Sequence, residues 1–284
     1  MYKRQALTIV AKSGVWKALN SEEFKRILLG SVHTLSEVVC AAIEGHPAAL
    51  NAVVESGVLK ALNPEEFKKI YQVVKESGYV GATMPTQYGG GGAPFTTAIL
   101  AGEVGIASNM AFYMGPGLSH GAMKTILKKA TEELKDKYLP NMTSGEWMGT
   151  MCLTEPQCGT DLGLIKTTAK PVNDHYELNG QKIWISFGEH DLTENIIHLL
   201  LARTPDAPAG IKGISLFLVP KRLDDNSRNP IFCGGLEHKL GINSSPTCVM
   251  NLDNAKGWLV GEENKGMEAI FLMMNDARLK VGLQ

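Results

Sequence analysis

The hydrophobic pattern of this chain changes period near Trp147, and this change limits the possible folds more than any other feature. Up to about Tyr138 apolar residues recur at the spacing of a helix, whereas beyond Trp147 they form short runs typical of strands. We therefore predict an α+β multidomain chain. It comprises an N-terminal α-helical domain over 1–146, an antiparallel β-barrel domain over 147–262, and the first helix of a C-terminal helical bundle over 263–284.

The clearest helix is predicted to begin at Pro64 and to end at Ser77-Gly78. Asn63 is suited to the N-cap, and proline is favoured at the first helical position. Its apolar stripe consists of Phe67, Ile70, Tyr71 and Val74. Further helices are expected at about 95–108, at about 119–138 and from Lys265.

One stretch of the N-terminal region occurs twice. Residues 13–27 match residues 56–70 at 12 of 15 positions. Two copies are too few for a solenoid, so a local duplication is the simplest interpretation. Residues 1–52 are left without a structural prediction.

The β-domain is predicted from strand-like runs and turn residues. Asn179-Gly180 stands between two such runs, which predicts a β-hairpin. Further strands are expected at 195–203, 213–221, 246–252 and 257–261.

Composition and charge exclude several classes of function. The net charge of −1 over 284 residues shows no basic excess, so neither a nucleic acid nor an anionic membrane is expected as partner. No apolar stretch reaches membrane-spanning length, and we predict a soluble, cytoplasmic protein. The five cysteines are odd in number and contain no C-x-x-C pair, so we expect buried thiols, with neither a disulfide framework nor a metal site.

Two polar or glycine-rich stretches invite a functional interpretation that their spacing does not support. The run at 88–94 lacks the Gly-Lys-Ser/Thr of a phosphate loop, and Phe95 occupies the last glycine position of a dinucleotide motif. A flexible turn is the simpler interpretation. The acidic and histidine-containing stretch at 189–198 lacks the H-E-x-x-H order, and a solvated loop is favoured there over a metal site.

The segment MCLTEPQCGTD, residues 151–161, is the strongest candidate for a binding site. An apolar run ends abruptly at Thr154, and a proline turn leads to Gly159 and a second small hydroxyl residue, Thr160. Such an arrangement frees backbone N–H groups and hydroxyls at one strand end, where they suit a flat polar ligand.

Together with GQKIWIS, residues 180–186, this segment resembles the acyl-CoA dehydrogenase family. The motifs TMPTQYGG, LPNMTSGEW and NDARLKVGLQ occur in family order, and the resemblance covers about 62–284. The sequence of 189–203 looks most like the branch that acts on 3-(methylthio)propionyl-CoA. The resemblance implies a helical domain, a central β-barrel and a C-terminal bundle, with FAD between the barrel and the bundles.

The resemblance also implies roles for individual residues. The flavin site would be formed by Met151, Cys152, Leu153, Thr154, Gly159, Thr160, Trp184, Ile185 and Ser186. Trp184 would pack on the ring and Ser186 would lie near flavin N5. The acyl-CoA substrate would contact Thr160, Asn275, Asp276 and Arg278.

The implied reaction is α,β-dehydrogenation of an acyl-CoA, with electrons passed to an electron-transfer flavoprotein, by a homo-oligomer, dimer or tetramer. The family's base is usually a Glu of the C-terminal bundle, and no Glu in this sequence matches it. We therefore expect these 284 residues alone to be inactive. A flavin oxidase of the same fold and a non-catalytic binding protein remain alternatives.

Overall fold

The computed structural model describes residues 64–284 and places them in two units that divide between Tyr79 and Val80. The described part of the first unit contains α6, Pro64–Glu76. The four residues of the predicted apolar stripe are buried, and Gly78 ends the helix in a left-handed conformation with φ of 70°. This helix is confirmed. The repeat at 13–27 and the first part of its second copy lie outside the described residues.

The second unit begins at Val80. Its first helix is the short η1, Thr86–Tyr88, and the glycine-rich loop follows that helix. The amides of all residues from 89 to 93 donate to carbonyls between Gly81 and Thr86, at 2.9–3.1 Å. The predicted flexible turn is therefore a compact loop, because all these backbone donors bond to carbonyls of the segment just before it.

Two helices follow, α7 at Phe95–Lys129 and α8 at Glu132–Thr143. The predicted helix at 95–108 is confirmed, and a break at Asn109, with φ of −159°, ends that first part of α7. The predicted helix at 119–138 is wrong as a single element. Ala130 is extended, and the Thr131 side chain caps α8 by accepting a hydrogen bond from the amide of Leu134.

The β-domain is a seven-stranded sheet in the order β1-β4-β5-β7-β3-β2, with β6 paired to β7. The strands are β1 Trp147–Cys152, β2 Thr168–Val172, β3 His175–Ser186, β4 Asn195–Ala202, β5 Ser215–Pro220, β6 Ile231–Leu236 and β7 Thr247–Leu259. The β1–β4 pair is parallel and the other five strand pairs are antiparallel, so the sheet is mixed.

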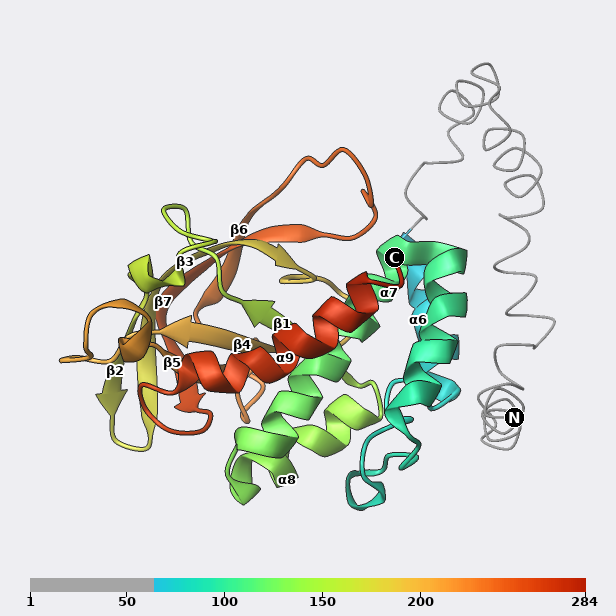
Figure 1. Cartoon of the computed structure of the whole chain (residues 1–284), viewed down its shortest axis with the longest axis horizontal. Helices are drawn as coiled ribbons and strands as arrows, with labels where there is room; N and C mark the ends of the chain where they lie inside the picture. The colour runs from blue at the N-terminus through green and yellow to red at the C-terminus, as the bar shows by residue number, and fades with distance from the viewer. Residues whose placement is uncertain (1–63) are drawn as a thin grey trace. The chain divides into compact units, whose positions relative to one another are not determined.

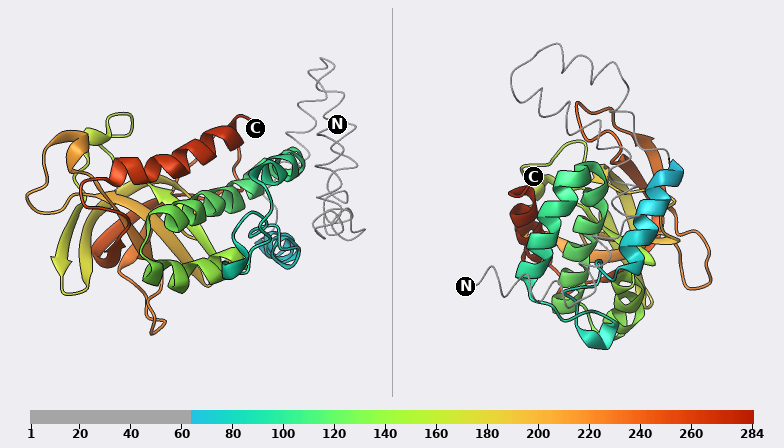
Figure 2. Two further views of the ribbon diagram at one scale, coloured as in Figure 1. Left: turned by 60° about the horizontal axis from the view of Figure 1, so that its bottom comes forward. Right: turned by 90° about the vertical axis from the view of Figure 1, so that its right-hand side faces the viewer.

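The sheet curls toward a barrel, and backbone hydrogen bonds join its edge strand β2 to the chain just after β4 (Figures 1 and 2). Ala169 at the start of β2 donates to the carbonyl of Arg203 after β4 at 2.7 Å, and Arg203 donates to Thr167 at 2.9 Å. The interior is filled by apolar side chains of all these strands, among them Leu178, Leu200, Phe217 and Met250, each with zero exposed surface.

The predicted hairpin at Asn179-Gly180 is wrong. β3 continues through this pair with a bulge, and the turn between β2 and β3 lies at Asn173-Asp174, where Asn173 has φ of 53°. Gly180 has φ of 151°, and a Cβ there would lie 2.5 Å from Thr167 Oγ1. The glycine thus serves a bulge with a close neighbour instead of a turn.

The final helix, α9, spans Gly266–Val281, as the pattern from Lys265 predicts. It lies along α7 (Figures 1 and 2), and its Ile270 and Met273 are buried. Within residues 64–284, no helix combines the length and the apolar character needed to cross a bilayer.

Candidate flavin site

The two sequence motifs meet in space at the end of β1. The amide of Ile183 donates to the carbonyl oxygen of Thr154 at 2.9 Å, so the strand end abuts the middle of β3. Met151, Leu153, Thr154 and Ser186 are half-buried, whereas Cys152 and Ile185 are buried. The half-buried groups therefore form one edge of the barrel wall.

Trp184 projects from this edge. The register of β3 against β7 shifts between Lys182 and Ile185, and Trp184 itself has φ of 59°. The irregularity turns the indole outward, and 60% of the residue is exposed. A large aromatic face held in a strained backbone beside polar groups is a feature of a binding site, because neither the strain nor the exposure stabilises the fold.

The turn after β1 brings Gly159 over Thr154. Glu155 and Cys158 exchange backbone hydrogen bonds at 2.9 and 3.0 Å, which closes the turn. A Cβ on Gly159 would lie 3.2 Å from Thr154 Cγ2, so glycine keeps the space beside this hydroxyl residue open. Thr160 is exposed directly after it.

A buried ion pair that the sequence analysis missed lies behind this edge. Lys182 Nζ is 2.8 Å from Glu155 Oε1 and 3.1 Å from the carbonyl oxygen of Leu153. Burial alone raises the pKa of Glu155, but the charge and hydrogen bonds of Lys182 and Thr167 outweigh it and lower that pKa to about 2. The bulge at Gly180 breaks the alternation of β3, so the sequence offered no clear signal that Lys182 faces inward.

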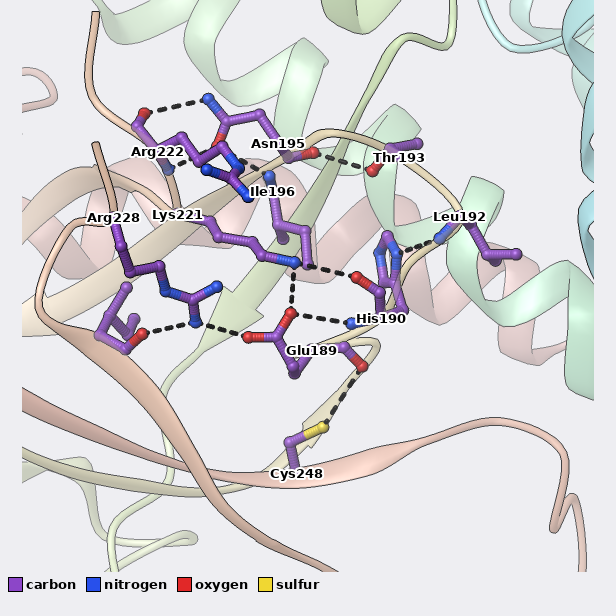
Figure 3. A network of polar contacts seen from close by, with 11 residues as sticks. Glu189, His190, Leu192, Thr193, Asn195, Ile196, Lys221, Arg222, Arg228 and Cys248 are labelled. Carbon is purple, nitrogen blue, oxygen red and sulfur yellow. Dashed lines mark hydrogen bonds and ion pairs between the residues drawn. The ribbon is translucent and has the colours of Figure 1, made fainter. Parts of the chain in front are cut away.

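The stretch at 189–198 is anchored by ion pairs, as Figure 3 shows. The carboxylate of Glu189 lies between Lys221 and Arg228, with its Oε2 2.5 Å from Arg228 Nη2. Lys221 also donates to the carbonyl of His190 at 2.9 Å. The prediction of a solvated loop is wrong for Glu189 and His190, because both are half-buried and bonded to other parts of the protein. No set of metal-binding side chains is found among the described residues.

His198 is completely buried beside the proposed flavin edge. Its Nδ1 lies 2.7 Å from Thr150 Oγ1, and burial lowers its pKa to about 3. Burial raises the pKa of Cys152 to about 11, which keeps this thiol protonated and unreactive. Cys152, Cys158 and Cys248 are buried free thiols, as predicted, and Cys233 is half-buried.

The three α9 residues predicted to contact substrate differ in their surroundings. Asn275 and Arg278 are exposed and bonded to each other. Asp276 is buried, with Oδ2 2.7 Å from Lys280 Nζ and 3.2 Å from His120 Nδ1. Lys124 lies 3.4 Å from Asp276 Oδ1, so both carboxylate oxygens have protein partners. Asp276 therefore joins α9 to α7, and we do not retain it as a substrate contact.

Comparison with known proteins decides the family. Residues 48–146 match the N-terminal domain of acyl-CoA dehydrogenases, and residues 150–255 match the middle domain. The chain belongs to the acyl-CoA dehydrogenase family. The family fold therefore agrees with the helical and β-domains described above.

Individual relatives support this membership. 3-Methylmercaptopropionyl-CoA dehydrogenase of Ruegeria pomeroyi is 46% identical over 75% of this chain and 37% of its own length. A butyryl-CoA dehydrogenase of Syntrophomonas wolfei is 43% identical over 58% of this chain and 30% of its own. The solved Bacillus anthracis acyl-CoA dehydrogenase, complexed with FAD, has a TM-score of 0.68 at 26% identity, covering 93% of this chain and 41% of that one. The chain thus spans about a third of the length of these curated relatives.

The residues of the edge fit the flavin that family membership implies. Trp184 offers an exposed aromatic face, and the adjoining strand end and turn carry the half-buried hydroxyls of Thr154 and Ser186 and the open space at Gly159. A flat ring with a polar rim requires this combination.

Proposed function

We propose that this protein is an FAD-dependent acyl-CoA dehydrogenase that converts an acyl-CoA thioester to the 2-enoyl-CoA. The single observation that carries the proposal is the exposed Trp184, held beside the Thr154 strand end by the Ile183–Thr154 hydrogen bond. FAD, when bound, supplies the hydride acceptor, and the residues of this chain bind and orient it.

Each residue of the edge has a proposed task. Trp184 covers the ring, and the backbone of 151–154 with the Thr154 hydroxyl lines its polar edge, while the buried side chains of Cys152 and Ile185 support this wall from the barrel interior. Ser186 provides a hydroxyl near N5. The turn at Gly159-Thr160 leaves room for the FAD pyrophosphate. These tasks follow from exposure and chemistry: the indole is apolar and accessible, and the hydroxyls are half-buried or exposed.

The substrate is proposed to be a short thioether acyl-CoA or a straight-chain acyl-CoA. The named activities of the Ruegeria and Syntrophomonas relatives support both choices. Thr160, Asn275 and Arg278 are exposed and available for acyl-CoA contacts, and Arg278 is suited to the CoA phosphates. We assign the catalytic base to no residue of this chain. The proposed electron acceptor is an electron-transfer flavoprotein, and the proposed assembly is a homo-oligomer.

Turnover of the protein at its full natural length tests the proposal. We expect FAD-dependent oxidation of 3-methylmercaptopropionyl-CoA or butyryl-CoA, with faster reoxidation by electron-transfer flavoprotein than by oxygen. A preference for branched or aromatic acyl groups would overturn the substrate class. Faster reoxidation by oxygen would instead identify an oxidase.

A further inference from the structure

We propose that Lys182 is a positioning residue for the flavin site, and that its buried ammonium group fixes the Leu153–Thr154 peptide relative to Trp184. This inference rests on the proposed function, because it concerns the binding of FAD. Lys182 lies two residues before Trp184 on β3, and its Nζ donates to the carbonyl oxygen of Leu153 at 3.1 Å. One side chain thus connects the two segments that the flavin would contact.

The Lys182 ammonium also holds the far side of Thr154. Its 2.8 Å contact to Glu155 Oε1 means that the residues before and after Thr154 are both bonded to the same cation. The Ile183–Thr154 hydrogen bond then fixes the carbonyl of Thr154 itself. All three residues of the strand end are therefore placed by two consecutive residues of β3.

Glu155 does not depend on Lys182 for its own position. The Glu155 carboxylate also accepts from Thr167 Oγ1 at 2.5 Å, from the amides of Lys166 and Thr167 at 2.7 and 3.1 Å, and from Gln157 Nε2 at 2.6 Å. Loss of the lysine should therefore leave Glu155 and its turn in place. The Leu153 carbonyl, in contrast, would lose the side-chain donor that ties it to β3.

A lysine in this place is costly for the fold, which argues for a positional role. Lys182 has no exposed surface, and taking an ammonium group out of water costs free energy that an ion pair recovers only in part. An apolar side chain of similar volume would fill the space without that cost. It could not, however, donate to a backbone carbonyl beside the binding edge.

A second lysine of the same domain provides a matched control. Lys221 is also buried, pairs with a carboxylate, Glu189, and donates to a backbone carbonyl, that of His190. Its partners, Glu189 and His190, lie in the segment after β3 (Figure 3). Lys221→Met therefore removes the same kind of contact without touching 151–154.

The experiment measures FAD affinity and the hydrogen exchange of the Ile183 amide in Lys182→Met, Lys182→Met/Glu155→Gln and Lys221→Met. The double variant buries no unpaired charge, so any loss of FAD affinity in it comes from the missing lysine contact and not from an unpaired carboxylate charge. It also replaces the single variant in the comparison with Lys221→Met if the single variant does not fold. We expect FAD binding to weaken about tenfold or more in both Lys182 variants, and to stay within about twofold in Lys221→Met. Exchange at Ile183 should be faster only in the Lys182 variants.

Three results would overturn the inference while leaving the proposed function intact. They are unchanged FAD affinity in folded Lys182→Met, recovery of wild-type affinity in the double variant, and an equal loss in Lys221→Met. Failure of the wild-type protein to bind FAD would instead overturn the proposed function, and this inference with it.

Discussion

The amide of Ile183 lies 2.9 Å from the carbonyl oxygen of Thr154, which joins the end of β1 to the middle of β3. β1 and β3 are not paired as strands, because β1 pairs with β4 and β3 pairs with β2 and β7. This one bond therefore holds Thr154 against β3 at the residue directly before Trp184. It explains why two motifs far apart in the sequence can act on one ligand.

The Ser186 hydroxyl is expected to stabilise the reduced flavin. In Ser186→Ala the two-electron reduction potential should fall by about 20 mV, which corresponds to the roughly 1 kcal/mol of one neutral hydrogen bond. The measurement is reduction against a reference dye at equilibrium. Ser227→Ala, in an exposed loop where Ser227 bonds to Asp225, is the control and should leave the potential unchanged. An unchanged potential in Ser186→Ala would remove this residue from the site.

The bulge at Gly180 is expected to require glycine. Gly180→Ala would place a Cβ 2.5 Å from Thr167 Oγ1 at φ of 151°. We expect a loss of about 2 kcal/mol or more in the free energy of unfolding, measured by denaturant titration. Gly235→Ala in β6 has no atom within 4 Å of the added Cβ and should change stability by no more than about 0.5 kcal/mol. Equal stability of the two variants would contradict the bulge geometry.

Buried His198 is expected to make stability depend on pH in the acid range. Its pKa falls from 6.5 to about 3 because burial disfavours the charged ring. Between these values the unfolded chain binds the proton and the folded chain does not, so stability decreases as the pH falls below 6.5. At about pH 5.5 the loss from this residue is about 1.4 kcal/mol.

Unfolding of the wild type and of His198→Asn at two pH values tests this dependence. Asparagine keeps a polar partner for Thr150 but does not titrate. The free-energy difference between about pH 7.5 and pH 5.5 should therefore be smaller in the variant by about 1.4 kcal/mol. The same difference in both proteins would show that His198 takes up its proton equally well in the folded state.

Much of the fold could be predicted because its signals are local. The runs at 195–203 and 213–221 contain β4 and β5, which are buried throughout, and the helix after Lys265 follows its apolar spacing. The prediction of a hairpin turn at Asn179-Gly180 was wrong because the same dipeptide suits a turn and a bulge. The contact with Thr167, which lies far away in the sequence, favours the bulge. The break at Ala130 was missed because the apolar pattern continues across it.

The candidate site could be predicted only in part. Motif resemblance pointed to 151–154 and Trp184-Ser186, and the structure brings these together. The partners of buried charges were not predictable, because Lys182 and Glu155, like Asp276 and His120, meet only through the tertiary fold. Periodicity can at most suggest that a lysine faces inward, and it never identifies the partner that such a lysine meets.

Titration of the purified protein with FAD, followed by tryptophan fluorescence, tests the central claim most directly. We predict saturable quenching in the wild type and in Trp258→Phe, and loss of most of that quenching in Trp184→Phe, since Trp184 would lie against the bound flavin. Absence of FAD binding in the wild type, or quenching that persists undiminished in Trp184→Phe, would contradict the account.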